Sequence, residues 1–221
     1  MNEKNKVQIE GLIVDCRIDT LPKNNISCAS VIVCTMEKMP DGSIDKAYHR
    51  VRFPISSRLN IELPKELNIP QAKNYIALTG ELHYDDNKQP FIFTDDSNVS
   101  FPKKISSTKN NATIYLEGKL DEIVNASKNA ATIIVNVQSS KNDQIKVPVI
   151  IDSRKNPIEW AMISSSSVNV GDIIKTSGNL RGQIFSNGID KNIIMTTSVI
   201  SKSISIKQNL QKQVKQGQHT L

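Results

Sequence analysis

The chain has 221 residues, of which 38% are hydrophobic and 5% aromatic, and its formal net charge is +6. This length fits one large all-β domain or two domains of about 100 residues, and internal repeats in the sequence are needed to distinguish the two organisations. No run of the sequence approaches the roughly 18 consecutive apolar residues of a membrane span, and residues 1–6 lack the apolar core of a signal sequence. We therefore expect a cytoplasmic protein with no membrane partner.

The positive charge is confined to the second half of the chain. Residues 1–105 contain 14 Lys and Arg against 14 Asp and Glu, which leaves 14 against 8 for residues 106–221. Part of the excess lies in residues 207–221, a polar tail with lysines and no acid. The tail fits either a disordered, solubilising end or an arm that contacts nucleic acid. The folded part is therefore only mildly basic.

Ten short runs rich in β-branched residues predict ten strands. In the first half they span residues 7–14, 27–34, 49–55, 75–83 and 91–95. In the second half they span residues 113–120, 131–137, 145–151, 172–180 and 191–200. A set of five strands thus occurs twice.

A longer insert separates the third and fourth strand of each set. Residues 58–69 contain Pro64 and predict a loop with at most a short helical turn. Residues 156–165 predict a short helix that starts at Pro157. We expect Trp160, which lies in this helix, to be buried.

Two glycine motifs recur in the same order in both halves. An apolar-Glu-Gly sequence ends at Gly11 and again at Gly118, and a Gly-polar-Leu sequence starts at Gly80 and again at Gly178. A glycine inside a strand suggests strong curvature or a close approach of another backbone, as in small barrels. The repetition predicts a duplicated domain, with boundaries at 1–105, 106–206 and a basic polar tail, expected to be disordered, over 207–221.

The first half resembles bacterial single-stranded DNA-binding proteins over roughly residues 5–101. The resemblance is carried by Asn5-Lys6-Val7-Gln8-Ile9-Glu10-Gly11-Leu12, by Ala47-Tyr48-His49-Arg50-Val51 and by Leu78-Thr79-Gly80-Glu81-Leu82. It implies an all-β fold of two tandem five-stranded barrels of the oligonucleotide/oligosaccharide-binding (OB) type, each with at most one short helix. Two such domains in one chain resemble the two-barrel versions of these proteins, which dimerise so that four barrels surround the DNA.

The third predicted strand supplies the first candidate binding residues. Tyr48 occupies the position where the family usually carries a stacking Trp, and it either stacks on a base or packs against residues 36–39. Alternation puts Arg50 and Arg52 on the same face as Tyr48. These arginines either bind phosphate or pair with the acids of residues 41–45. His49 points the other way and is expected to be structural.

Further candidates lie near two hairpins. Tyr84 and Phe91 flank residues 85–90, which correspond to the DNA-embracing hairpin of the family, although Asp85 and Asp86 in it would repel phosphate. In the second half, the candidates come from the third strand and from the region of residues 182–188: Lys146, Arg181, Phe185 and Lys191.

No catalytic signature is present in the sequence. Phosphate-loop, zinc-protease and nucleophile-elbow motifs are absent, and three histidines form no constellation. Cys16, Cys28 and Cys34 lack metal-ligand spacing and predict buried, reduced thiols. We therefore expect no enzyme, cofactor or metal.

The candidate residues and the resemblance together predict sequence-independent binding of single-stranded DNA. The resemblance further implies a homodimer that acts in replication, recombination or repair, with replication proteins as partners. The alternative is an OB-fold adaptor that assembles a replication, conjugation or phage complex through protein contacts. The chain ends without the acidic tip by which the family recruits partners.

Overall fold

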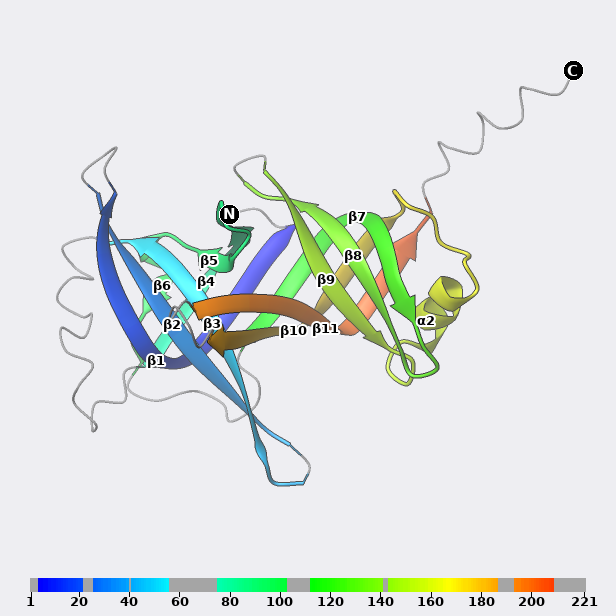
Figure 1. Cartoon of the computed structure of the whole chain (residues 1–221), viewed down its shortest axis with the longest axis horizontal. Coiled ribbons are helices and arrows are strands. Elements are labelled where there is room, and N and C mark those ends of the chain that lie inside the picture. Colours follow the sequence, from blue (N-terminus) through cyan, green and yellow to red (C-terminus); the bar gives the residue numbers. More distant parts are fainter. Residues whose placement is uncertain are drawn as a thin grey trace, which may run out of the picture.

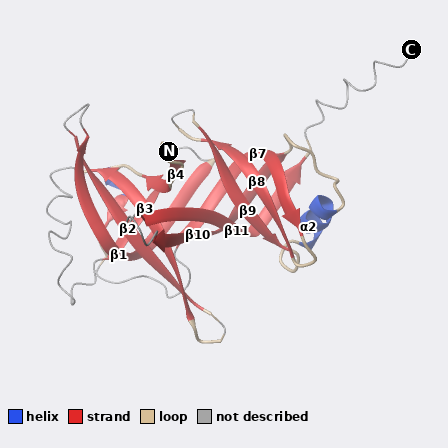
Figure 2. Cartoon of the chain, viewed as in Figure 1, coloured by secondary structure: helices blue, strands red, loops and turns tan. Residues whose placement is uncertain are grey.

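The computed structural model describes residues 4–21, 26–39, 41–55, 75–102, 112–140, 143–186 and 193–208. In these ranges, strands build two barrels that lie side by side along the long axis of the molecule (Figures 1 and 2). The first barrel contains β1 (Asn5–Leu21), β2 (Ile26–Lys38), β3 (Ile44–Pro54), β4 (Tyr75–Tyr84), β5 (Pro90–Phe93) and the edge strand β6 (Val99–Ser100). The second contains β7 (Ala112–Ala126), β8 (Ala130–Gln138), β9 (Gln144–Asp152), β10 (Ile173–Ser186) and β11 (Ile193–Lys207).

Both barrels close in the same way. β1 pairs with β4 along its first half and with β2 along its second half, and a short parallel pairing between β3 and β5 completes the ring. In the second barrel β7 pairs in the same manner with β10 and β8, and β9 and β11 form the parallel contact. This confirms the prediction of two tandem five-stranded barrels.

The strand registers identify equivalent residues in the two barrels. Val7 lies opposite Gly80 and Ile114 lies opposite Gly178. A Cβ on Gly80 would stand 2.4 Å from the carbonyl oxygen of Phe93, and one on Gly178 would stand 2.2 Å from that of Ile200. Since no side chain fits there, the repeated glycines mark a close backbone approach, as predicted.

The two barrels join through their first strands. β1 and β7 are antiparallel, with Val7 opposite Ile114 at the centre, Asn5 opposite Leu116 and Ile9 opposite Ala112. Because Ile9 is the equivalent of Leu116, and Asn5 that of Ala112, the contact is nearly two-fold symmetric. The chain therefore contains its own pseudo-dimer.

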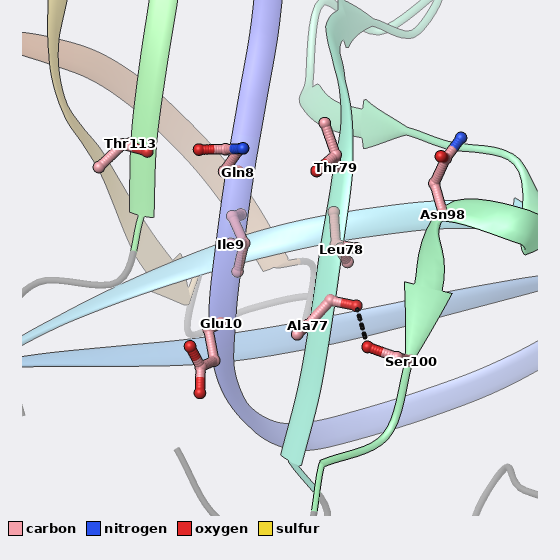
Figure 3. A pocket seen from close by; sticks show the side chains of 9 residues that line it. All are labelled: Gln8, Ile9, Glu10, Ala77, Leu78, Thr79, Asn98, Ser100 and Thr113. Carbon is pink, nitrogen blue, oxygen red and sulfur yellow. Dashed lines mark hydrogen bonds between the residues drawn. The ribbon is translucent and has the colours of Figure 1, made fainter. Parts of the chain in front are cut away.

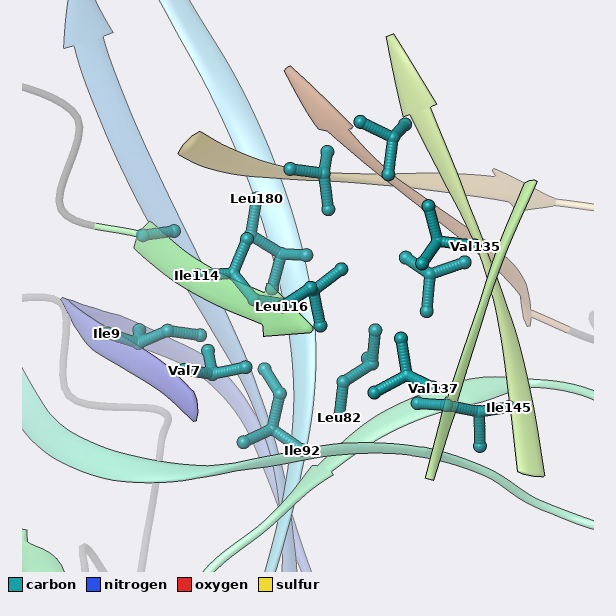
Figure 4. Packing of buried hydrophobic residues seen from close by; sticks show 14 of the residues in the cluster. Val7, Ile9, Leu82, Ile92, Ile114, Leu116, Val135, Val137, Ile145 and Leu180 are labelled. Carbon is teal, nitrogen blue, oxygen red and sulfur yellow. The ribbon is translucent and has the colours of Figure 1, made fainter. Parts of the chain in front are cut away.

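One hydrophobic cluster runs through both barrels. Figure 4 shows Val7, Leu82 and Ile92 of the first barrel near Ile114, Leu116, Val135, Val137, Ile145 and Leu180 of the second. All these side chains are buried. Burial of apolar area stabilises by about 25 cal/mol per Å², so the shared cluster favours the docked arrangement of the barrels.

The helix α2 (Pro157–Ser164) lies where the sequence predicts it, with Pro157 in its first turn. It covers the end of the second barrel away from the first (Figure 1). Trp160 is half-buried, and its Nε1 donates to the carbonyl oxygen of Ser127 at 3.0 Å. No helix in the described part of the chain is long and apolar enough to cross a membrane.

Several details differ from the sequence-based expectations. β10 continues to Ser186, so Gly182 lies within a strand and not in the turn expected at 182–188. The extension of β10 beyond residue 180 lengthens its ladder with β11, because residues 181–186 pair with residues 193–198. Cys34 is buried as expected, but Cys16 and Cys28 are only half-buried. The insert 58–69, the division at 105/106 and most of the tail lie outside the described residues.

Candidate nucleic-acid interface

β3 presents the predicted cationic and aromatic face. Ala47, His49, Val51 and Phe53 are buried, whereas Tyr48, Arg50 and Arg52 alternate with them and are half-buried. Alternation therefore holds along the whole strand. The three predicted side chains share one face of the first barrel.

The β4–β5 hairpin brings an aromatic ring beneath one of these arginines. Cζ of Arg52 lies 4.6 Å from the centroid of the Phe91 ring. The ring of Phe91 is also stacked against that of His83, with centroids 5.6 Å apart and an interplanar angle of 24°. A guanidinium over a ring gains cation–π stabilisation and is held in place for a further contact. Phe91 and Arg52, predicted separately, thus form one unit.

Asp85 supplies the counter-charge of this unit. Its Oδ2 lies 3.7 Å from Nη1 of Arg50 and 3.5 Å from Nη2 of Arg52. The other oxygen, Oδ1, accepts from the backbone N–H groups of Asn87 and Gln89. Within the described ranges, neither arginine has an ion pair with the acids of residues 41–45, which was the expected alternative. Two positive charges and one negative charge leave this cluster with a net charge of +1.

Burial affects the first arginine more than the second. The side chain of Arg50 is 16% exposed and that of Arg52 is 34% exposed. Burial, together with the charge of Arg52, lowers the pKa of Arg50. Arg52 is therefore the more available of the two for an external anion.

Tyr48 lies at the edge of the face that meets the second barrel. Its cross-strand neighbour on β2 is Cys34, and residues 36–38 belong to β2 and not to a loop. A Cβ on Gly182 of β10 would clash with the carbonyl oxygen of Tyr48, so the two backbones touch. The backbone of Tyr48 is thus fixed, while its ring stays half-exposed.

Two further titratable groups near the face are buried or half-buried. His49 is buried with Nε2 3.1 Å from Oγ1 of Thr35, as its inward direction predicts. Burial, with the charge of Arg181, lowers the pKa of His49 to about 3. Burial raises the pKa of Tyr84 to about 12, since its ring packs against the core. Tyr84 flanks the hairpin as expected, but only part of its ring is accessible.

The equivalent face of the second barrel carries lysines. The register that places Leu12, Cys34 and Tyr48 in one row across β1–β3 places Lys119, Asn136 and Lys146 in the same row across β7–β9. Arg50 and Arg52 correspond to Pro148 and Ile150. The second barrel therefore has cations at this row, but neither ring nor arginine.

Lys119 of this row lines a cavity of about 180 Å³ together with Lys4, Glu117 and the side-chain amides of Asn136, Gln138 and Gln144. The side chain of Lys146 is 66% exposed, with Nζ 2.8 Å from Oδ2 of Asp121. Hydrogen bonding to Asp121 raises the pKa of Lys146. Sequence reasoning missed Lys119, although its place directly after the repeated Gly118 marks it as the equivalent of Leu12.

The remaining predicted residues lie on or beyond β10. Arg181 lies between the barrels, where it pairs with Glu37 and Asp45, and its side chain is 17% exposed. Phe185 is half exposed and lies opposite the exposed Ile194 on β11. Lys191 is outside the described residues. Arg181 is thus already paired with two acids of the first barrel, whereas Phe185 remains open to solvent.

A larger surface cavity lies on another side of the first barrel. Its volume is about 440 Å³ and it is lined by Gln8, Thr79, Asn98 and Thr113, with Glu10 as the charged group among the described lining residues (Figure 3). Amides, hydroxyls and a carboxylate offer no positive charge to a phosphate. The face of β3 is therefore the better candidate. The described residues contain no cluster of three or more His, Cys, Asp and Glu that could hold a metal.

Solved structures share this architecture. The wild-type single-stranded DNA-binding protein from Thermus aquaticus matches 93% of this chain and 93% of its own, with a TM-score of 0.61 and 15% identity. A deletion mutant of the same protein, which also carries one arginine-to-alanine substitution, matches 93% of this chain and 95% of its own, with a TM-score of 0.60 and 14% identity. No family model and no curated sequence matches the chain. The chain therefore has a fold of two OB domains, as the Thermus protein does.

Proposed function

We propose that this protein binds single-stranded DNA without sequence preference and catalyses no reaction. The observation that carries the proposal is the Arg52–Phe91 unit on the outer face of the first barrel, with Arg50 and Tyr48 beside it. The Tyr48 ring is half-buried and can stack on any base, and the Arg52 guanidinium, which the Phe91 ring supports, can bind phosphate through two nitrogens. This combination favours an unpaired strand, whose bases are free to stack.

The second barrel extends the cationic surface. Lys119 and Lys146 occupy the row that is equivalent to that of Tyr48, and both are exposed. A lysine contributes to phosphate binding as a point charge, without reading the base. Stacking in one barrel and charge in the other would both be tolerant of sequence. The Thermus protein of the same fold is a single-stranded DNA-binding protein, which supports the same role here.

The finer parts of the proposal are a cytoplasmic homodimer that acts in replication, recombination or repair together with replication proteins. Its DNA-binding set comprises Tyr48, Arg50, Arg52, Tyr84, Phe91, Lys146, Phe185 and Lys191, to which we add Lys119. Sedimentation analysis of the free protein tests the dimer. A monomer across the micromolar range would contradict it.

Titration of fluorescent oligo-dT, followed by anisotropy at low and moderate salt, tests the binding. We expect affinity to fall steeply as salt rises, because each bound phosphate releases counterions. The pair Arg50→Gln and Arg52→Gln should weaken binding, whereas Arg154→Gln should not, because Arg154 lies in the turn between β9 and α2, away from the face of β3. No binding at micromolar protein in low salt would refute the proposal.

A second candidate function is favoured by one observation. Asp85 already pairs with both arginines, which leaves the first face nearly neutral, as an adaptor that contacts proteins would allow. A capture experiment after nuclease treatment distinguishes the two functions. Capture of a specific protein that is unaffected by Tyr48→Ala, together with absent oligo-dT binding, would favour the adaptor.

A further inference from the structure

The β2–β3 hairpin is longer than its counterpart in the second barrel. In the second barrel the last pair before the turn is Gln138 opposite Gln144. In the first barrel the ladder continues by two further pairs, through Glu37 opposite Asp45 to Lys38 opposite Ile44. The extension projects beyond the rest of the barrel (Figure 1). It begins at a pair of carboxylates.

Two acids directly opposite each other destabilise an antiparallel ladder, because neighbouring side chains on one face lie within about 5 Å. Here the second barrel supplies the compensating charge. Nη2 of Arg181 bonds to Oε2 of Glu37, and Nη1 bonds to Oδ2 of Asp45. One guanidinium thus bridges both acids, which a single ammonium group could not do with the same fork geometry.

Backbone contact accompanies the charge bridge. Gly182, the residue after Arg181, packs its backbone against the carbonyl group of Tyr48. On β11, the N–H of Met195 donates to Oε1 of Gln89 in the β4–β5 hairpin at 2.7 Å. β10 and β11 therefore hold both elements that form the face of Tyr48, Arg52 and Phe91.

At the symmetry-related contact, where the hairpin of the second barrel meets the first barrel, a different interaction joins the two barrels. Residues 139 and 143 of the second barrel are the equivalents of Glu37 and Asp45, and their turn meets β4 of the first barrel. There the N–H of Ser140 donates to Oε2 of Glu81 at 3.2 Å. Each fourth strand thus holds the root of a hairpin in the other barrel, and the Arg181 side combines three charges.

We infer that Arg181 is a positioning residue. Its bonds to Glu37 and Asp45, which we call the latch, fix the base of the β2–β3 hairpin against the second barrel and so orient the face that carries Tyr48. The sequence alone predicts that Arg181 binds nucleic acid. The latch itself follows from the contacts of Arg181, whereas its effect on DNA rests on the proposed function. Two readouts separate the roles: hydrogen exchange of the hairpin, and the salt dependence of oligo-dT binding.

Hydrogen exchange is measured first, on the free full-length protein. In Arg181→Met we expect amides of residues 36–39 and 43–46 to exchange about tenfold faster, because local opening becomes easier. Glu81→Met, which removes the acceptor of the Ser140 N–H, is the matched control and should affect the hairpin that carries residues 139, 140 and 143 instead. Arg154→Met removes an exposed arginine and should affect neither hairpin. Unchanged exchange of residues 36–46 in Arg181→Met would overturn the latch.

Two more variants keep the test valid if Arg181→Met folds poorly. Arg181→Lys retains the charge without the bridge, so it should give a smaller increase in exchange of the same amides. Adding Asp45→Asn to Arg181→Met should recover part of the protection, since it removes the repulsion between the two acids. Full protection in Arg181→Lys, or no recovery in the double variant, would contradict the bridge.

Oligo-dT binding then distinguishes the latch from a phosphate contact. We expect Arg181→Met to weaken binding about fivefold with an unchanged salt slope, because no phosphate contact is lost. A decrease of the slope by about one would identify Arg181 as a phosphate ligand and overturn the positioning role. If the wild type binds no oligo-dT, the proposed function fails, and hydrogen exchange still decides on the latch.

Discussion

The two barrels share a backbone and differ in the chemistry of one face. Both have a bulge after the first part of their first strand, between Ile13 and Asp15 and between Leu120 and Glu122. At an outward-facing position, where the backbone imposes no such constraint, Tyr48 of the first barrel has Lys146 as its equivalent in the second. Closure of a small barrel fixes glycines, bulges and inward side chains, whereas outward positions are free to differ. We therefore expect the first barrel to contribute stacking and the second to contribute charge.

One pair of equivalent buried positions holds a histidine in the first barrel and a valine in the second, and the largest predicted effect follows from this pair. His49 of the first barrel has Val147 as its equivalent. Burial lowers the pKa of His49 to about 3. Below pH 6.5 the unfolded chain therefore takes up a proton that the folded chain does not, and stability falls until about pH 3. His49→Val should make the loss of stability shallower by up to about 1.4 kcal/mol per pH unit in this window.

Urea unfolding between pH 7 and pH 4 measures this difference. The slope with pH is the readout, because the valine also loses the hydrogen bond to Thr35 and so changes stability at neutral pH. Val147→Ala serves as a control that perturbs the core of the other barrel without changing proton uptake. Identical slopes for the wild type and His49→Val would contradict the assignment of acid sensitivity to His49.

Loss of the stacking ring is the next largest effect. Tyr48→Ala should weaken oligo-dT binding about tenfold, since a stacked base contributes about 1–3 kcal/mol. The salt slope should stay the same, because tyrosine carries no charge. Tyr115→Ala removes an exposed tyrosine from a different face and should have little effect. Equal losses in both variants would mean that neither ring has a specific role.

The sequence predicts the strands better than it predicts the contacts between them. Alternation along residues 47–53 correctly assigns inward and outward side chains, and the repeated glycines correctly indicate duplication. The length of β10 was not predictable from its own residues, because Gly182 favours a turn locally. Its strand conformation comes from pairing with β11 and from contact with β3.

Ion pairs between distant segments were the least predictable feature. Arg181 and Glu37 are separated by 144 positions, and no local pattern relates them. Likewise, Asp85 was expected to repel phosphate, but the sequence does not show that its carboxylate is directed at Arg50 and Arg52. Such contacts depend on how two barrels and a hairpin dock, which is a property of the whole fold.

Asp85 offers a way to sharpen the difference between the faces. Asp85→Asn removes the negative charge beside Arg50 and Arg52 but keeps an oxygen that accepts from the N–H groups of Asn87 and Gln89. We expect affinity for oligo-dT to rise about threefold, with a steeper salt dependence. Asp86→Asn, at the neighbouring exposed position, should change affinity less. Weaker binding by Asp85→Asn would show that the carboxylate orders the arginines rather than competing with DNA.

The smallest effect is expected on the second face, where charge acts without stacking. Lys146→Ala should weaken oligo-dT binding by only about twofold to threefold, because its ammonium group already pairs with Asp121 and is exposed to screening by salt. The same change should reduce the salt slope by about one, since one phosphate contact is lost. Lys155→Ala, in the turn before α2, also removes an exposed charge, at the far end of the barrel. If Lys155→Ala reduces the slope as much as Lys146→Ala, binding reflects net charge alone, and the lysine row has no special place on the DNA path.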